Sequence, residues 1–410
     1  MSRFLNIVIG AIIISSLFSC GIDNPDVPKN PIAKEGDTVS RTLIVYAMAE
    51  NSLSNYLQAD INEVFAAAAK VPDDCRLFAF LDNSKPDFTP HICRFYNNNG
   101  VSEKDTVFLF EKDFCSSDTA ALREVLDMLL NDYPTESLDI VFSSHGSGWL
   151  RHHAKSAPWR SIGVDNGENS YSDKTVDVIE VEELAAVLEN LPVKVDRLMF
   201  DACFMQTVET AYALRDAAKW IIASPAEIPG NGAPYEKLVP LFFSQEAGVK
   251  EIIDVYKNDY DTSNNGVVLS TVRCENMTLL ADATYPLVKK YFNKGTEMSV
   301  GAIFSYLSEG YFYSSVSYPA FYDINAVMLE VLDDSEYTEW KRVFDGAVQY
   351  LNCSERWYTA VLRRSFTVDS AVCSGMSMYL PKDDSSHECF NADFATTEWF
   401  SAAGWNETGW

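Results

Sequence analysis

The chain has 410 residues, of which 32 are Lys or Arg and 59 are Asp or Glu, so its formal net charge is -27; 47% of the residues are hydrophobic. This apolar content supports a large globular core and excludes an intrinsically disordered chain. The acidic balance, together with the lack of any run of Lys or Arg, excludes a nucleic-acid-binding surface, because it would repel a phosphate backbone. A positively charged peptide would instead be attracted.

The N-terminus has the pattern of a bacterial lipoprotein signal peptide. An apolar stretch follows Arg3 and ends in Leu17-Phe18-Ser19-Cys20, an arrangement that resembles a lipobox and is too short for a comfortable membrane span. We therefore predict a signal peptide over residues 1–20 with a lipidated Cys20, and an ordinary secretory signal is the alternative. Residues 21–40, rich in Pro, Asp and Asn, predict a flexible tether. The expected location is the cell envelope, anchored in the outer membrane and either periplasmic or surface-exposed.

Strands and helices alternate along the middle of the chain, which predicts an α/β fold with a mostly parallel sheet and helices on both faces. We assign this fold to a domain over residues 41–250. The less regular remainder predicts a C-terminal α+β subdomain over residues 251–410, packed on the sheet. The expected strands are 42–48, 76–82, 138–143, 196–201, 219–223 and a pair near 356–367 and 375–380, and the expected helices are 52–70, 118–132, 180–190, 205–217, 276–292 and 338–352.

Two reactive side chains follow two of these strands. His145 comes just after the strand at 138–143, and Cys203 just after the strand at 196–201. Because ligands bind outside the carboxyl ends of parallel strands, we expect His145 and Cys203 to meet at one edge of the sheet. The helix expected at 205–217 would place its positive dipole end near Cys203 and favour the thiolate. The N–H groups of Gly146 and Cys203 are candidates for an oxyanion hole, which suits acyl transfer.

The same segments resemble a known family, the clostripain-like cysteine peptidases, which share the caspase-type α/β fold. HGSGW at 145–149 is similar to the family's histidine motif, and DACFMQTVETAYAL at 201–214 is similar to its nucleophile motif. The resemblance implies a peptidase in which Cys203 is the nucleophile, His145 is the general base and acid, and the intermediate is a thioester acyl-enzyme. Further similar segments extend the resemblance to roughly residues 40–400: RTLIVYAMAEN at 41–51, SPAEIPGNGAPY at 224–235 and SGMSMYLP at 374–381.

Many members of this family cleave after Arg or Lys, and a buried basic side chain requires a carboxylate partner. Asp201 is the first candidate, because it lies two residues before Cys203 on the same strand and its side chain points to the same side. The alternative is a structural aspartate that accepts hydrogen bonds from loop amides or caps the next helix. Glu227 is either a second acid of the pocket or a solvated loop residue, and Ser224 is assigned to the same substrate-binding loop.

No cofactor is expected to be required, and no metal site is assigned. The cysteines other than Cys20 and Cys203 form no C-x-x-C pair and are predicted to be mostly buried thiols. The adjacent His152 and His153 point apart, which argues against zinc. The acidic loop at 165–173 has oxygen ligands without EF-hand spacing. Calcium is therefore kept as an option, because some members of the family depend on it, and a solvated loop is the alternative.

Four basic residues lie between His145 and Cys203, and they suggest self-cleavage as an activation step, with an active single chain as the alternative. We predict a monomeric endopeptidase acting on protein or peptide substrates, with no nucleic-acid partner and with membrane contact through the lipid anchor only. Two other classes stay open: a catalytically silent surface lipoprotein that binds a peptide or glycan, and an acyltransferase in which an amine intercepts the acyl-enzyme. The basic residues are Arg151, Lys155, Arg160 and Lys174.

Overall fold

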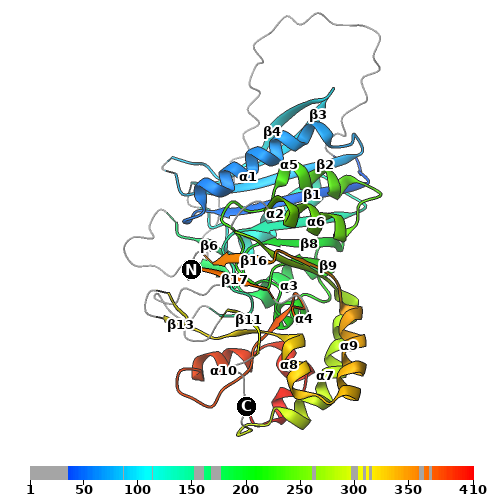
Figure 1. The fold of residues 1–410 in the computed structure, drawn as a ribbon. Helices are drawn as coiled ribbons and strands as arrows, with labels where there is room; N and C mark the ends of the chain where they lie inside the picture. The colour runs from blue at the N-terminus through cyan, green and yellow to red at the C-terminus, as the bar shows by residue number, and fades with distance from the viewer. Residues whose placement is uncertain are drawn as a thin grey trace, which may run out of the picture. The chain divides into compact units, whose positions relative to one another are not determined.

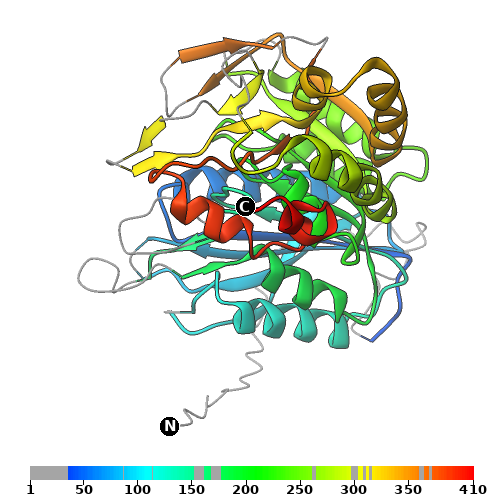
Figure 2. The same ribbon diagram turned by 90° about the horizontal axis from the view of Figure 1, so that it is seen from below.

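The computed structural model contains one compact unit over Ile32–Trp410, seen from two directions in Figures 1 and 2. No helix among the described residues is long and apolar enough to cross a membrane. The predicted signal peptide, with Cys20 and most of the tether, lies outside the described residues. The structure describes residues 36–85, 87–112, 114–151, 161–167, 177–260, 265–296, 303–307, 311–313, 316–359, 364–368 and 372–410.

A nine-stranded sheet runs through the middle of this unit, in the order β15-β10-β9-β8-β5-β1-β2-β3-β4 (Figure 1). The five strands from β9 to β2 are parallel, and the two strands at each end of the sheet pair antiparallel. This arrangement confirms the predicted mostly parallel α/β sheet. The strands are β1 (Arg41–Ala49), β2 (Cys75–Asn83), β3 (His91–Asn98), β4 (Val101–Leu109), β5 (Leu138–Ser143), β8 (Val195–Asp201), β9 (Ala218–Ala223), β10 (Val268–Arg273) and β15 (Val348–Cys353).

Helices cover both faces of the sheet, as predicted, and each face has its own hydrophobic core. Leu43 and Val45 of β1 pack in one core and Ile44 and Tyr46 in the other, because successive side chains of a strand point to opposite faces. Burial on both faces explains why β1 is an almost continuous apolar run. The first core includes α1 (Ser54–Ala67), α5 (Tyr235–Phe243) and α6 (Val249–Tyr260); the second includes α2 (Thr119–Asp132), α3 (Val181–Glu189), α4 (Val208–Ala213), α7 (Met277–Tyr291) and α9 (Asp334–Ala347).

The second half of the chain contributes strands to the central sheet and also forms a separate small sheet with several helices. Strands β10 and β15 belong to the central sheet, so the expected division at residue 250 runs through that sheet. The small sheet consists of β11 (Ser305–Leu307), β14 (Phe321–Asp323) and β18 (Ser377–Met378). The other elements are β6 (Ile162–Asp165) paired with β7 (Asp177–Ile179), β12 (Tyr311–Tyr313) paired with β13 (Val316–Tyr318), and helices α8 (Ile324–Val331), α10 (Glu388–Phe394) and α11 (Glu398–Ala402).

Three predicted elements differ from the structure. The helix expected at 205–217 is the shorter α4, because Thr207 is extended and caps its start by accepting the Thr210 N–H. The helix expected at 338–352 ends at Ala347, where the chain becomes β15. The expected strand pair of 356–367 with 375–380 is also wrong, because β16 (Arg356–Thr359) forms a hairpin with β17 (Arg364–Thr367), whereas β18 pairs with β14.

The described cysteines are all free, and their exposure is more varied than predicted. Three are buried, four including Cys203 are half-buried, and one is exposed. The buried ones are Cys93, Cys274 and Cys373, the half-buried ones are Cys75, Cys115, Cys203 and Cys353, and the exposed one is Cys389.

Candidate active site

The loop after β5 lies directly against the turn after β8. Ser143 and Asp201 are paired in register at the ends of these strands, and His145 and Cys203 each follow two residues later. A Cβ atom at Gly146 would lie 2.8 Å from the Cys203 carbonyl oxygen. The two segments therefore approach too closely for a side chain at residue 146, which explains why glycine follows His145.

His145 is held from two directions. The Oγ atom of Ser52 lies 2.8 Å from His145 Nε2, and the Gly163 N–H donates to the His145 carbonyl over 3.0 Å. Ser52 follows β1 and Gly163 belongs to β6, so the histidine is positioned by two further elements. The sequence prediction did not include Ser52; the only signal for it was the polar end of the first strand.

The turn at Cys203 is fixed by the loop at 224–228. Phe204 has a φ of +59°, a conformation that costs a non-glycine residue about 1–2 kcal/mol. The Phe204 N–H donates to the Ala226 carbonyl over 3.0 Å, and the Ile228 N–H donates to the Cys203 Sγ over 3.4 Å. The ring of Phe204 also stacks on Phe321, with centroids 5.0 Å apart. These contacts hold the strained turn that presents the thiol.

The electrostatic environment of Cys203 differs from the prediction. Burial raises the pKa of Cys203 to about 12, and the charge of Glu227 raises that pKa further, against the lowering effect of the Ile228 N–H. The expected helix dipole is not at the thiol, because α4 begins at Val208 and has only six residues. In this state Cys203 is therefore a protonated thiol, and its activation must come from a group other than α4.

The two N–H groups assigned to an oxyanion hole have no acceptor in the described part of the chain. Neither the Gly146 N–H nor the Cys203 N–H donates a hydrogen bond there, although the flanking Ser147 N–H donates to the Ser161 carbonyl over 3.3 Å.

Asp201 is a buried hydrogen-bond acceptor. Its Oδ2 accepts from the Ala233 N–H and the Tyr235 hydroxyl, both over 2.9 Å, and its Oδ1 accepts from the Tyr256 hydroxyl over 2.8 Å. Burial raises the pKa of Asp201 in spite of these bonds. The alternative interpretation of Asp201 is a structural residue that accepts hydrogen bonds from loop amides, and the bond from the Ala233 N–H is of this kind. This bond connects the end of β8 to the segment just before α5.

A second buried acid, Asp60 of α1, lies beside Asp201. A Cβ atom at Gly232 would be 2.8 Å from an Oδ2 atom of each carboxyl group. The Asp60 Oδ2 makes no hydrogen bond, and burial, followed by the charge of Asp201, raises the pKa of Asp60 to about 9. The pair therefore holds a proton at neutral pH. Sequence reasoning did not find Asp60, because its helical position gives no sign of which strand residue it faces.

The remaining assigned residues line the loop after β9. Ser224 is fully buried, and its hydroxyl donates to the Ala226 carbonyl over 3.0 Å, so it shapes the loop and does not face solvent. Glu227 is only 9% exposed, so the alternative of a solvated residue is wrong. Its carboxylate acts on Cys203 through its charge.

The segment between His145 and Cys203 is described only in part. Arg151 forms an ion pair with Glu182 of α3 over 3.3 Å. Of the acidic loop expected at 165–173, the structure describes residues 165–167. The predicted cleavage residues Lys155, Arg160 and Lys174, the histidines His152 and His153, and the rest of the acidic loop lie outside the described residues.

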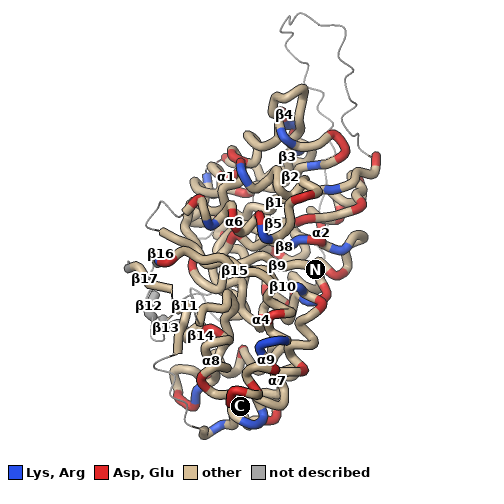
Figure 3. Tube along the Cα trace, turned by 45° about the vertical axis from the view of Figure 1, so that its right-hand side comes forward, with Lys and Arg blue, Asp and Glu red and all other residues tan. Residues whose placement is uncertain are grey.

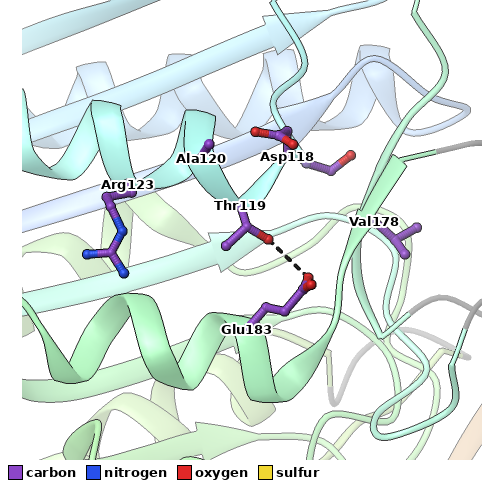
Figure 4. A pocket seen from close by; sticks show the side chains of 7 residues that line it. Asp118, Thr119, Ala120, Arg123, Val178 and Glu183 are labelled. Atoms are coloured by element: carbon purple, nitrogen blue, oxygen red, sulfur yellow. Dashed lines mark hydrogen bonds between the residues drawn. The ribbon is translucent and has the colours of Figure 1, made fainter. Parts of the chain in front are cut away.

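A surface hollow near α2 and α3 is separate from this site. Figure 4 shows Thr119 of α2 donating a hydrogen bond to Glu183 of α3 across it, over 3.0 Å. Neither His145 nor Cys203 lines it. In Figure 3 the acidic and basic positions of the described chain are interspersed over many elements. The hollow is lined by Ser117, Asp118, Thr119, Ala120, Arg123, Val178 and Glu183.

Comparison with known proteins identifies the chain's relatives. A model of the clostripain family matches residues 45–410. Clostripain of Hathewaya histolytica is 25% identical over 221 residues, which are 48% of this chain and 41% of that protein. The chain thus spans about two fifths of the length of this curated relative.

Solved structures extend the comparison to the fold. A secreted C11 cysteine protease from Bacteroides thetaiotaomicron, in complex with an irreversible peptide inhibitor, superposes with a TM-score of 0.76 at 26% identity, covering 90% of this chain and 99% of that chain. An inactive zymogen C11 protease from Parabacteroides distasonis gives a TM-score of 0.73 at 23% identity, with the same two coverages. The expected caspase-like fold is confirmed.

Proposed function

Because the chain belongs to the clostripain family of cysteine peptidases, we propose that it is an endopeptidase in which Cys203 attacks the substrate carbonyl and His145 transfers the proton. The observation that carries the proposal is the close approach of the His145 loop to the Cys203 turn, where a Cβ atom added at Gly146 would lie only 2.8 Å from the Cys203 carbonyl oxygen. A thiol and an imidazole on abutting segments are the groups that nucleophilic acyl transfer requires.

The proposed reaction has two halves. His145 accepts the Cys203 proton as the sulfur forms a bond to the carbonyl carbon, and it then gives that proton to the leaving amine as the C–N bond breaks. Water, deprotonated by His145, next attacks the thioester and releases Cys203 and the acid product. The N–H groups of Gly146 and Cys203 would stabilise the oxyanion, for which their lack of other acceptors in the described chain is the support.

A preference for Arg or Lys before the cleaved bond is the finer part of the proposal. It is supported by the two buried acids, Asp60 and Asp201, of which Asp60 has an oxygen without a hydrogen bond. The expectation that Asp201 and Cys203 share a strand is wrong, because β8 ends at Asp201 and Cys203 lies in the turn two residues later; the proximity of Asp201 to this turn is the support for its role. A basic side chain entering there would replace the proton shared by the acid pair, since an opposite charge favours both ionised forms.

The test is incubation of the purified chain with a mixed peptide library, with cleavage sites identified by mass spectrometry. We expect cleavage after Arg and Lys, and loss of at least about a thousandfold in rate for Cys203→Ala, because the nucleophile is removed. Cys389→Ala is the matched control, since Cys389 is an exposed cysteine of the same chain. It should retain the rate of the unaltered chain.

The Asp201→Asn variant tests the specificity separately. It should lower cleavage after Arg and Lys more than cleavage at other residues, whereas a purely structural aspartate would lower all of them equally. Cleavage that survives in Cys203→Ala would contradict the role of Cys203 as the nucleophile. No cleavage by the unaltered chain would contradict the proposed peptidase and favour the peptide-binding lipoprotein.

A further inference from the structure

Two free thiols that the proposed reaction does not use meet beside β15, at the edge of the central sheet. Cys353 ends β15, and Cys373 lies a few residues before β18. Cys373 is buried in the hydrophobic core of one sheet face, and the half-buried Cys353 packs against that core. The two thiols are hydrogen-bonded to each other. Two separate segments thus bring a pair of sulfur atoms together.

The segment that carries Cys373 packs closely on the strands beside Cys353. The Ser270 hydroxyl of β10 donates to the Gly375 carbonyl over 2.6 Å, and a Cβ atom at Gly375 would lie 2.8 Å from Leu351 Cδ1. Leu351 is two residues before Cys353 on β15, so both side chains point to the same face. The close contact of Gly375 with Leu351 therefore supports that of Cys373 with Cys353.

Hydrogen bonds to Tyr306 and Asp323 hold the Cys373 segment in place. The Tyr306 hydroxyl lies 3.3 Å from Cys373 Sγ and donates to Asp323 Oδ2 over 2.5 Å. The Ser374 N–H donates to the same Asp323 oxygen over 2.7 Å, and the Gly375 N–H donates to the Tyr306 hydroxyl over 2.9 Å. The sulfur of Cys373 and the backbone after it are therefore fixed beside β15.

The two thiols differ in reactivity. The hydrogen bond to Cys373 lowers the pKa of Cys353 to about 7, whereas the hydrogen bond to Cys353, together with burial, raises the pKa of Cys373. The thiolate is the attacking species in thiol–disulfide exchange, and access to the thiol also sets the rate. Cys353, which is the more exposed of the two, is therefore the thiol that an external disulfide would meet first.

We propose that Cys353 and Cys373 form an intramolecular disulfide, with a disulfide compound as the oxidant. The Cys353 thiolate attacks one sulfur of that compound, which forms a mixed disulfide and releases a first thiolate. Cys373 then loses its proton and attacks Cys353 Sγ, which forms the intramolecular S–S bond and releases a second thiolate. The protein gives up two electrons and two protons, and the oxidant becomes two thiols.

This crosslink would fasten a segment that supports the Cys203 turn. The Ser377 N–H of β18 donates to the Gln206 carbonyl, just after that turn, over 3.0 Å. Strand β18 also pairs with β14, whose Phe321 stacks on Phe204. We therefore expect the disulfide to help keep the Cys203 turn in its conformation on heating. The effect on activity rests on the proposed function, but the crosslink itself does not.

Peptide mapping of the purified, unaltered chain tests the crosslink directly. One sample is incubated with glutathione disulfide and another with dithiothreitol, free thiols are blocked with iodoacetamide under denaturing conditions, and both samples are digested with trypsin. Trypsin cuts after Arg356 and Arg364, so Cys353 and Cys373 fall on separate peptides. We expect these peptides to be joined in the oxidised sample only. Glutathione left on Cys353, or alkylation of both cysteines in that sample, would overturn the proposal.

The melting temperature gives a second readout. Oxidation should raise it by about 3–5 °C in the unaltered chain, because a crosslink that closes a loop of about 20 residues restricts the unfolded state. Cys353→Ser cannot form the bond and should show no rise. Cys389→Ser removes an exposed cysteine and is the matched control, so it should keep both the joined peptides and the rise. An equal rise in Cys353→Ser would overturn the assignment.

The link to the Cys203 turn has its own readout. If the chain cleaves peptides, the oxidised chain should keep a larger fraction of its activity than the reduced chain after both are heated to a temperature between their two melting temperatures. Equal losses of activity would overturn the support of the turn and leave the disulfide. A crosslinked chain that cleaves nothing would count against the proposed function alone, because peptide mapping needs no turnover.

Discussion

At the scale of single residues, the charge of Glu227 acts against ionisation of the Cys203 thiol. The buried Glu227 carboxylate places a negative charge near the sulfur, and that charge raises the pKa of the thiol. A nucleophile kept protonated in the free protein is less open to alkylation and oxidation, since the thiolate is the reactive form. A positively charged substrate would offset the Glu227 charge on arrival, so that activation and binding would be coupled.

Replacing Glu227 with Gln should therefore make Cys203 more reactive in the free protein. Removing the negative charge lowers the pKa of Cys203, so the pH at which iodoacetamide modifies it shifts downward, and the rate at pH 8 rises roughly 3- to 10-fold. The measurement is the alkylation rate of the Cys203 peptide by mass spectrometry as a function of pH.

The control for this change is Glu236→Gln, an exposed glutamate of α5. It should leave the alkylation profile of Cys203 as it is in the unaltered chain. A Glu227→Gln profile that is unchanged, or shifted to higher pH, would show that the carboxylate does not act on the sulfur.

The positions of these residues were predictable to different degrees. His145 and Cys203 stand out in the sequence because each follows a buried strand, and β5 and β8 do lie side by side. Ser52 gave only the polar end of the first strand as a signal and Asp60 gave none, since their importance depends on which distant residue the folded chain brings to them. Chain neighbours can be read from a sequence pattern, but contacts between separate elements require the tertiary structure.

At the scale of elements, the loop after β5 is shaped by how closely it meets the Cys203 turn. Gly148 has a φ of +66°, and a Cβ atom there would lie 2.7 Å from the Phe204 carbonyl oxygen. A side chain at residue 148 is thus excluded by two effects: the backbone conformation and the contact with Phe204. Gly100 separates these effects, because it has a φ of +85° but nothing within 4 Å of its Cβ position.

Gly148→Ala should consequently destabilise the protein more than Gly100→Ala. The Gly100 variant should cost about 1 kcal/mol from backbone strain alone, whereas the Gly148 variant should cost about 3 kcal/mol or more, because the clash moves the Cys203 turn. Urea unfolding of both variants beside the unaltered chain gives the comparison. Equal losses of stability would mean that the β5 loop can retreat from the turn, and that its close approach is not enforced.

The same scale shows where local patterns misled the prediction. The apolar spacing after Cys203 continues as if a helix began at Met205, yet Thr207 caps α4 and the residues before it form the turn that presents the thiol. The hairpin of β3 and β4 was not predicted, although Asn99 and Gly100 between the two strands both have positive φ, the conformation that Asn-Gly favours in tight hairpins. In the first case the turn at Cys203 delays the start of the helix to Val208. In the second case the Asn-Gly pair was a hairpin signal that the prediction did not use.

At the scale of the whole molecule, the parallel centre of the sheet was predictable and its antiparallel edges were not. Alternating strands and helices indicate parallel pairing directly, because each crossover brings the next strand back in the same direction. Strands β10 and β15 come from the second half of the chain, where irregular spacing hides their partner. Their addition places the two halves in one compact unit, so we expect contacts between the halves to contribute to the stability of the whole.

Glu209 is one such contact, and it should make the stability of the unit depend on pH. Its Oε1 accepts the Tyr379 N–H over 2.9 Å, which joins α4 to the segment after β18, and its Oε2 is buried without a hydrogen bond. Burial raises the pKa of Glu209 from 4.5 to about 7. The folded state therefore binds more protons than the unfolded state between these values, and the contribution of Glu209 to stability falls as pH rises through that window, by on the order of 2–4 kcal/mol.

Urea unfolding at pH 5 and pH 8 measures this contribution when the unaltered chain is compared with Glu209→Gln. Glutamine cannot ionise, so the variant should lose less stability than the unaltered chain between the two pH values, and the difference between them isolates Glu209 from the other buried acids. Glu111→Gln, at an exposed position, should follow the unaltered chain. If Glu209→Gln loses as much stability as the unaltered chain, then Glu209 is already ionised at pH 5, and the junction of α4 with the second half of the chain tolerates its charge.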